Sequence, residues 1–414
     1  QMPNGSPFTP FSEVVEEYQH YQASAACARD RAFWAEQLTR LPEPATLSDE
    51  PLTTREPSAD LLRRHVAFDN AHLQALLARA PGVTPADIAF ALLALWTGRL
   101  SGRNDFAVGV IFMRRMGSAA LCATGPVLNV LPMAVHIAPA ATLPELAASL
   151  AGQMKTLRRH QRYDAEQILR DAGRVTHPTP LYGAVFNFKM FDYRLDVGGI
   201  NGITHQLASG PVNDMELALY QDEQGGLGLE ILANARRYDA DTLEQHIARL
   251  PLLLAQFASE PQLDCHAAEM VLPHEAQRIA RINDTGIMLP ADTLTAAIVR
   301  QALKTPDAPA LADEQYQFSY REMRQQVHAL AVRLQERGVK PGDIVAVALP
   351  RSVFLSLALQ AIVELGAAWL PLDTGYPDDR LQMMLEDAQP RLTLTSAGLE
   401  ARFAALTAQP LLIY

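Results

Sequence analysis

Two side chains in the first 270 residues could take part in chemistry, and they differ in type. Asn129 is an amide inside an apolar run, and a buried amide needs hydrogen-bond partners. This position fits a residue that faces a substrate channel, and it fits equally well an amide that bonds only neighbouring backbone. His160 follows a basic, helix-like stretch, and an imidazole suits general acid–base catalysis near neutral pH. A histidine in this position more often caps the helix, because the helix dipole favours a cation there.

The cysteines, and the residues nearest to a phosphate-binding loop, do not have the spacing that a metal, disulfide or phosphate site needs. The three cysteines, Cys27, Cys122 and Cys265, are far apart, which suits a reducing cytosol and predicts neither a zinc site nor a disulfide framework. A phosphate-binding loop needs paired glycines and a lysine. The nearest candidate, Thr-Ser-Ala-Gly at residues 395–398, has neither. We therefore expect no metal site and no nucleotide site in these 414 residues.

Length and charge limit the class of protein. A chain of 414 residues exceeds one ordinary hydrophobic core, so we expect two or three domains. The formal net charge of -11 is spread along the chain without a basic stripe, which argues against nucleic-acid binding. No apolar run reaches membrane-spanning length, and the first residues do not have the pattern of a signal peptide. We expect a cytoplasmic protein with no nucleic-acid partner and no membrane span.

The elements around Asn129 and His160 indicate a mixed α/β domain. Thr142 and Glu145 form a capping-box pattern at the start of the helix that ends near His160. A nearly all-apolar helix at residues 88–100 should be buried, and a further helix should close the domain at residues 240–257. Runs rich in β-branched residues predict six more strands besides one at residues 61–68. These lie near residues 106–112, 127–137, 181–189, 202–207, 215–221 and 227–233.

The pattern changes across residues 271–290, which are polar, carry the turn sequence Asn-Asp-Thr-Gly and are bounded by prolines. We therefore expect a first domain at residues 1–270, a linker at residues 271–290 and a second domain at residues 291–414. In the second domain helices and strands alternate regularly. Ser319 and Glu322 form a capping box at the start of one helix. This alternation predicts a parallel sheet with helices on both faces.

Four segments of the first domain resemble a known family. Residues 8–15, 125–132, 160–166 and 170–174 follow in the order of the last four motifs of nonribosomal peptide synthetase condensation domains, and residues 180–187 resemble the strand after them. The resemblance implies a chloramphenicol-acetyltransferase-like fold, of which residues 1–270 form mainly the second subdomain. The family's catalytic His-His…Asp-Gly signature is missing, since no two histidines are adjacent. The resemblance therefore gives no catalytic residue in this chain, and leaves Asn129 and His160 as candidates for the substrate channel.

The chain departs from the family pattern near both candidates. Val130 stands where a hydroxyl residue is usual, and Ala134 where an arginine is common. Arg162 replaces the usual aspartate, and Asp164-Ala165 replaces the usual Pro-Phe pair. These changes leave the implied fold intact. At these five positions the resemblance therefore assigns no side chain to the acceptor channel.

The second domain resembles the start of an adenylate-forming enzyme. Residues 318–323 and 365–373 are similar to the first two motifs of that family, and residues 376–381 extend the match. Both motifs are structural in the family, and its phosphate loop would follow residue 414. The resemblance implies a truncated adenylation (AMP-binding) domain that binds no cofactor itself. It also implies a parent enzyme that uses ATP, Mg and 4'-phosphopantetheine.

A condensation domain followed by an adenylation domain is the order in a peptide synthetase elongation module. Within the family, the chain is most similar to siderophore-forming synthetases. This implies a parent that joins a carrier-bound 2,3-dihydroxybenzoyl group to serine, with aryl and peptidyl carrier-protein domains as partners. We expect the 414-residue chain alone to be inactive. Two alternatives stay open: a free-standing condensation-like acyltransferase that uses His160, and a non-catalytic scaffold that docks carrier proteins.

Overall fold

A computed structural model describes residues 8–53, 57–115, 117–189, 195–202, 209–222, 225–289 and 292–414. The chain divides into two compact units, Gln1–Asp284 and Thr285–Tyr414, which are described separately below. Most of the strand predicted at residues 202–207 lies outside the described residues. Within the described part, no helix is both long and apolar enough to span a membrane.

The first unit is built on a six-stranded mixed sheet with the strand order β1-β8-β7-β4-β2-β3. β2 and β4 pair in parallel, as do β4 and β7, whereas the other neighbours are antiparallel. This confirms the predicted mixed sheet. Its strands are β1 (Leu61–Ala67), β2 (Asp105–Met113), β3 (Leu128–His136), β4 (Val185–Lys189), β7 (Met215–Gln221) and β8 (Leu227–Asn234), and a separate hairpin is formed by β5 (Leu195–Val197) and β6 (Ile200–Gly202).

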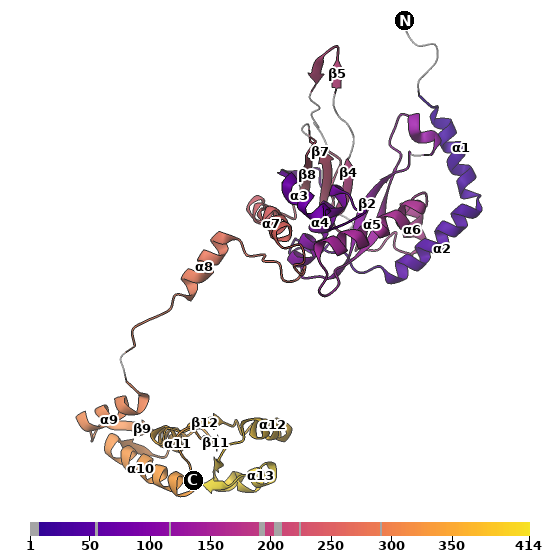
Figure 1. The fold of residues 1–414 in the computed structure, drawn as a ribbon. Coiled ribbons are helices and arrows are strands. Elements are labelled where there is room, and N and C mark those ends of the chain that lie inside the picture. Colours follow the sequence, from indigo (N-terminus) through magenta and orange to yellow (C-terminus); the bar gives the residue numbers. More distant parts are fainter. Residues whose placement is uncertain are drawn as a thin grey trace. The chain divides into compact units, whose positions relative to one another are not determined.

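Helices α3, α4, α5 and α7 lie along the six-stranded sheet (Figure 1), and α5 and α6 contact β3. α4 packs on α3, α5 and α7, and α2 contacts α1 and α6. The short 3-10 helix η1 (Ala119–Cys122) packs on α1. The helices are α1 (Phe11–Gln22), α2 (Ala25–Arg40), α3 (Asn70–Leu77), α4 (Pro85–Ser101), α5 (Leu143–Arg159), α6 (Ala165–Asp171), α7 (Ala240–Ser259) and α8 (Pro273–Asn283).

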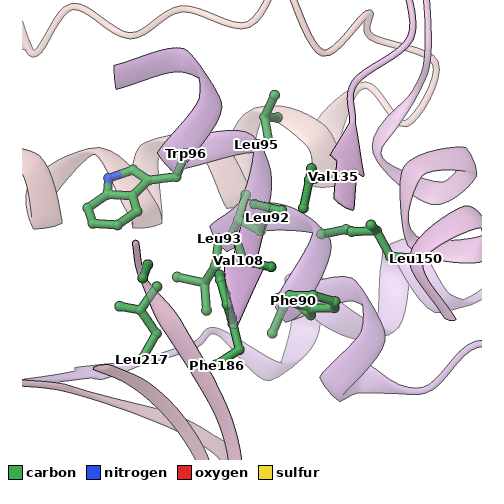
Figure 2. Close-up of a cluster of buried hydrophobic side chains, with 14 of the residues drawn as sticks. Phe90, Leu92, Leu93, Leu95, Trp96, Val108, Val135, Leu150, Phe186 and Leu217 are labelled. Atoms are coloured by element: carbon green, nitrogen blue, oxygen red, sulfur yellow. The ribbon is translucent and has the colours of Figure 1, made fainter. Parts of the chain in front are cut away.

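The core of the first unit forms between α4 and the sheet. As the apolar sequence predicted, every α4 residue from Ile88 to Gly98 is buried. Figure 2 shows Phe90 and Trp96 of α4 in one cluster with Phe186 of β4 and Leu217 of β7. The Phe90 and Phe186 rings meet edge to face with centroids 4.7 Å apart, a geometry that adds to their hydrophobic burial. Residues of β3 and α5 belong to this core, which anchors the strand that carries Asn129 and the helix that ends at His160.

The second unit contains a four-stranded, all-parallel sheet with the order β12-β11-β13-β14, which confirms the predicted parallel arrangement. Its capping box at Ser319 and Glu322 is also present. A short antiparallel pair, β9 with β10, lies outside this sheet. The elements are α9 (Leu294–Lys304), β9 (Pro309–Ala312), β10 (Gln317–Ser319), α10 (Tyr320–Glu336), β11 (Ile344–Ala348), α11 (Val353–Glu364), β12 (Ala368–Pro371), α12 (Asp378–Ala388), β13 (Leu392–Thr395), η2 (Ala397–Leu399), α13 (Glu400–Leu406) and β14 (Leu411–Ile413).

Candidate functional site

His160 ends α5. The helix begins with the predicted capping box of Thr142 and Glu145, and its buried face anchors it to the core. His160 is the C-cap residue, and its N–H donates to the Leu157 carbonyl over 2.9 Å. The indole Nε1 of Trp34, from α2, donates to the His160 carbonyl over 3.1 Å. One orphan carbonyl at the helix end is thus satisfied by a side chain from another helix.

The His160 imidazole is held on two sides by α2. Its Nδ1 lies 2.8 Å from Asp30 Oδ1, and its ring stacks on Phe33 with centroids 3.9 Å apart and planes 9° apart. An ionised carboxylate can only accept hydrogen bonds, so Nδ1 is the donor in a pair with ionised Asp30. In the neutral imidazole, Nε2 is then the acceptor. The side chain is 18% exposed, so solvent or a ligand has limited access to it.

Asp30 is a buried carboxylate with partners for both oxygens. Its side chain is 5% exposed, and the Tyr21 hydroxyl of α1 donates to Oδ2 over 2.7 Å. Burial, followed by the hydrogen bond to Asp30, raises the pKa of the Tyr21 phenol, which therefore remains a donor. The Arg162 guanidinium lies 5.1 Å from the centre of the Tyr21 ring. A buried charge is tolerated when it is paired and hydrogen-bonded, as Asp30 is here.

Asn129 is a buried β3 residue, 5% exposed, and the three hydrogen bonds of its side chain all reach one turn. Its Nδ2 donates to the carbonyls of Gln161 (3.0 Å) and Tyr163 (2.7 Å). Its Oδ1 accepts from the N–H of Ala165 over 3.1 Å. This turn joins α5 to α6 and begins directly after His160. The structure therefore brings Asn129 and His160 into one network, in which the Asn129 amide holds backbone.

Tyr163, within this turn, links it to α2 and α6. Its hydroxyl donates to Asp171 of α6 and accepts from Nε of Arg31, 2.8 Å away on α2. Arg31 and Asp171 also form an ion pair of 3.2 Å. Burial, and then the hydrogen bond to Asp171, raise the pKa of the Tyr163 phenol. Helices α2 and α6 are thereby tied to the turn that follows His160.

Glu17 of α1 forms a third link. Its carboxylate accepts from the Ser118 hydroxyl and the Ala119 N–H, each over 2.8 Å, and pairs with Arg162. Burial alone would raise the Glu17 pKa. The hydrogen bonds from Ser118 and Ala119 and the charge of Arg162 outweigh burial and lower it. Glu17 therefore joins α1, η1 and the turn through an ionised carboxylate.

The arrangement positions an imidazole, but no nucleophilic side chain among the described residues hydrogen-bonds it. Within the described part of the chain, the only side chain that hydrogen-bonds the His160 ring is Asp30. No group of three His, Cys, Asp or Glu side chains among the described residues could hold a metal ion. Asp30, Phe33 and Trp34 were not among the site residues predicted from the sequence, although their spacing of i, i+3 and i+4 places them on one helix face.

The residues of the second unit do not fit a bound nucleotide phosphate at the nearest candidate loop. Thr395 is fully buried and its hydroxyl donates to the Ala348 carbonyl over 3.2 Å. The following residues enter η2, where the Leu399 N–H donates to the Ser396 carbonyl over 2.9 Å. These groups are used for packing and turn formation. A phosphate would need them free.

Two family models match this chain, and each match falls within one of the two compact units. The condensation-domain family model matches residues 1–280, and the AMP-binding-enzyme model matches residues 298–412. The chain is 61% identical over 96% of its length to enterobactin synthase component F of Escherichia coli O157:H7, and covers 31% of that protein. It is 33% identical over 92% of its length to a vanchrobactin synthetase of Vibrio anguillarum, and covers 13% of it. The chain thus spans about a third of the enterobactin synthase relatives' length.

Solved structures show the same folds. The nonribosomal peptide synthetase FmoA3, bound to AMPPNP, aligns with a TM-score of 0.79 at 21% identity, over 100% of this chain and 45% of that one. The starter condensation domain of rhizomide synthetase aligns with a TM-score of 0.55 at 25% identity, over 64% of this chain and 60% of that one. A condensation match over more than half of the sequence, followed by an AMP-binding match, establishes that the chain belongs to the condensation-domain family of the nonribosomal peptide synthetases.

Proposed function

We propose that this chain works within a nonribosomal peptide synthetase of siderophore assembly. The parent enzyme activates serine as an adenylate and condenses it with a carrier-bound 2,3-dihydroxybenzoyl thioester. The observation that carries the proposal is the 61% identity to enterobactin synthase component F over 96% of the chain. That alignment runs through both the condensation and the AMP-binding segments in the same order. Aryl and peptidyl carrier-protein domains are the partners, and the parent uses ATP, Mg and 4'-phosphopantetheine.

Within this function, residues 1–270 contribute part of the condensation unit, residues 271–290 the linker and residues 291–414 the start of the adenylation unit. Asn129 and His160 act in the substrate channel as positioning residues. Support comes from the three hydrogen bonds of Asn129 to the 161–165 turn and from the Asp30 carboxylate that orients the His160 ring. A shift of this turn would move every group that it presents. A displacement of about 1 Å can cost around a hundredfold in rate.

The test uses the full-length enzyme that contains this chain. It is supplied with serine, ATP and an aryl carrier protein loaded with 2,3-dihydroxybenzoate, and the amide product is quantified by mass spectrometry. Serine-dependent pyrophosphate exchange, measured in parallel, reports adenylation separately. Asn129→Ala and His160→Gln should slow condensation at least tenfold and leave pyrophosphate exchange unchanged. His20→Gln, on the exposed face of α1, is the matched control and should alter neither rate.

Two results would contradict the proposal at different levels. Rejection of 2,3-dihydroxybenzoyl or serine, with another acyl group or amino acid accepted, would overturn the substrates. An unchanged condensation rate in Asn129→Ala would overturn the channel role of that residue and leave the substrate assignment standing.

A second candidate function is supported by the Asp30–His160 pair, because a carboxylate that orients an imidazole is an arrangement used by general bases. In this case the 414-residue chain itself would be a condensation-like acyltransferase. Turnover of a soluble 2,3-dihydroxybenzoyl thioester with a serine ester, abolished by His160→Gln, would favour it. A third alternative, a scaffold that only docks carrier proteins, predicts carrier binding without turnover in the full-length enzyme.

A further inference from the structure

A cavity of about 360 Å³ lies in the first unit between α2, β3 and α5. It is separate from the polar network of His160, although Phe33 and Trp34 border both. Its walls combine apolar groups with uncharged polar ones. They include Phe33, Trp34 and Leu41 of α2, Met133 of β3, and Gly152 and Gln153 of α5.

Three consecutive β3 residues, Pro132 to Ala134, line the cavity, which therefore runs along the strand's edge. Among the strands that the structure describes, β3 is the last of its sheet and pairs only with β2. On β2, the Gly109 N–H donates to the Ala184 carbonyl over 2.9 Å and the Ala107 N–H to the Glu43 carbonyl over 3.2 Å. Both amides thus point away from β3.

The register then fixes the direction of the β3 backbone. Gly109 is opposite Pro132, and Ala107 is opposite Ala134. In an antiparallel ladder, both members of such a non-hydrogen-bonded pair direct their N–H and C=O groups away from each other. The Pro132 carbonyl and the Ala134 N–H and carbonyl therefore point outward. Among the described residues, the Ala134 N–H forms no hydrogen bond outside the β2–β3 ladder.

The size and charge of the cavity favour an extended, uncharged chain. On α5 its lining runs from Ser149 to Leu157, eight helical rises or about 12 Å. About four residues of an extended strand cover the same length. The lining carries no acidic residue and one cation, Arg40, which already pairs with Glu36 over 3.2 Å. A charged ligand would therefore gain little from this cavity.

We propose that this cavity binds an extended peptide segment that adds to the free edge of β3. The peptide backbone pairs with Pro132 and Ala134, and an apolar side chain enters the space beside Met133 and Gly152. Main-chain pairing to a sheet edge gives affinity, and pockets for alternate side chains give selectivity. The occupant is an uncharged peptide strand of a partner protein.

The test uses the full 414-residue chain and a probe peptide, Val-Thr-Leu-Ser, with fluorescein at its N-terminus and an amide at its C-terminus. Fluorescence polarisation should show saturable binding with a Kd below about 1 mM. An affinity of this size is what a few weak contacts can provide. A peptide of the same sequence with alternate backbone amides N-methylated keeps the side chains and loses the donors. It should bind at least tenfold more weakly, because two hydrogen bonds are removed.

A variant separates this site from nonspecific binding. A side chain added at Gly152 meets no atom within 4 Å at its Cβ, so we expect Gly152→Leu to fold and to place its side chain in the cavity. Its matched control is Ala148→Leu, on an exposed position one turn earlier in α5 and outside the lining. Gly152→Leu should raise the Kd at least tenfold, and Ala148→Leu should not change it.

Hydrogen exchange gives a second readout, because the peptide should slow exchange of the Ala134 amide. Equal affinity for the N-methylated peptide, equal affinity in Gly152→Leu, or no saturable binding below about 1 mM would each overturn the proposal. None of these results bears on the siderophore assignment, which is tested by condensation and pyrophosphate exchange.

Discussion

Asp30 Oδ1 lies 2.8 Å from His160 Nδ1, although 130 residues separate them along the chain. Four residues after Asp30, the Trp34 indole donates to the backbone carbonyl of the same histidine. One face of α2 therefore fixes both the side chain and the backbone of the α5 C-cap. The turn after His160 is also hydrogen-bonded to the Asn129 side chain of β3. Helix α2 and strand β3 are therefore connected through His160 and this turn.

Removal of partners from Asp30 should destabilise the first unit. Tyr21→Phe removes one donor and should lower the free energy of unfolding by about 1–2 kcal/mol. Asp30→Ala leaves Tyr21 and His160 unpaired and should cost about 2–4 kcal/mol. In the Asp30→Ala background, Tyr21→Phe should cost less than about 0.5 kcal/mol, because the bond no longer exists.

Urea unfolding followed by tryptophan fluorescence checks this in a Trp369→Phe background, where only Trp34 and Trp96 of the first unit report. Tyr18→Phe is the control, because it removes the hydroxyl of a neighbouring α1 tyrosine and keeps the ring beside Arg114. Equal costs for Tyr21→Phe with and without Asp30 would show that the two side chains do not interact.

Loss of the Asn129 amide should open the turn that follows His160. Asn129→Ala leaves two carbonyls and one N–H without their partner, and should lower the free energy of unfolding by about 2–4 kcal/mol. The Ala165 amide should also exchange faster in hydrogen-exchange measurements. The control is Asn187→Ala, which removes a single side-chain bond to Glu216 and should cost about 1 kcal/mol. Unchanged exchange at Ala165 would contradict the positioning role.

Local patterns were sufficient to predict most elements of this fold. The capping boxes at Thr142–Glu145 and Ser319–Glu322 formed as expected, because such caps depend on residues three positions apart. The all-apolar helix α4 is buried along its length for the same local reason. Helix α8 was missed inside the predicted linker. The polar composition and the flanking turn residues of this segment indicated a linker, although its apolar residues have the spacing of an amphipathic helix.

The site could be predicted only in part, because its contacts join distant segments. The apolar run around Asn129 indicated a bonded amide, but the sequence could not identify the 161–165 turn as its partner. The position of His160 indicated a helix cap, and the structure places it there. The pairing with Asp30 depends on how α2 packs against α5. No local spacing contains that information.

Acid should loosen the contact between α1 and η1. The Glu17 pKa is lowered in the folded chain, so the carboxylate stabilises the fold fully above its unfolded pKa, near 4.3. This contribution is lost as the pH falls through the lower, folded value. At pH 7, Glu17→Gln should speed amide exchange at Ala119. The variant and the parent should converge only when the pH is below the lowered pKa of Glu17 in the folded chain.

The control for this experiment is Glu16→Gln, an exposed neighbour on α1. It should leave exchange at Ala119 unchanged at both pH values. A difference between Glu17→Gln and the parent that persists unchanged below the folded pKa of Glu17 would show that the ionised form of Glu17 does not support this contact.

The 414-residue chain should not exchange pyrophosphate in the presence of serine and ATP. The Thr395 hydroxyl is buried and bonded to Ala348, and residues 395–398 contain no lysine or glycine pair. The full-length enzyme is the positive control under the same conditions. Serine-dependent exchange by the shorter chain would show that a phosphate site exists elsewhere in the second unit.

Limited proteolysis should cut the connection between the units first. Every residue from 283 to 289 is exposed, with Met288 at 100%, and α8 has no buried residue. We expect early cuts between residues 280 and 292 or within the second unit, and a resistant piece near residues 1–270. The second unit should melt at a lower temperature, because it is smaller and buries a smaller core.

Trypsin and calorimetry on the whole chain check this expectation. Arg281→Gln removes one tryptic site, and cleavage should then move to Arg278 at a similar rate, since both lie on exposed α8. Strong protection of the variant would show that α8 is covered. A single cooperative melt with uniform protease resistance would show that the two units unfold together, and would contradict both the lower stability of the second unit and the division near residues 283–286.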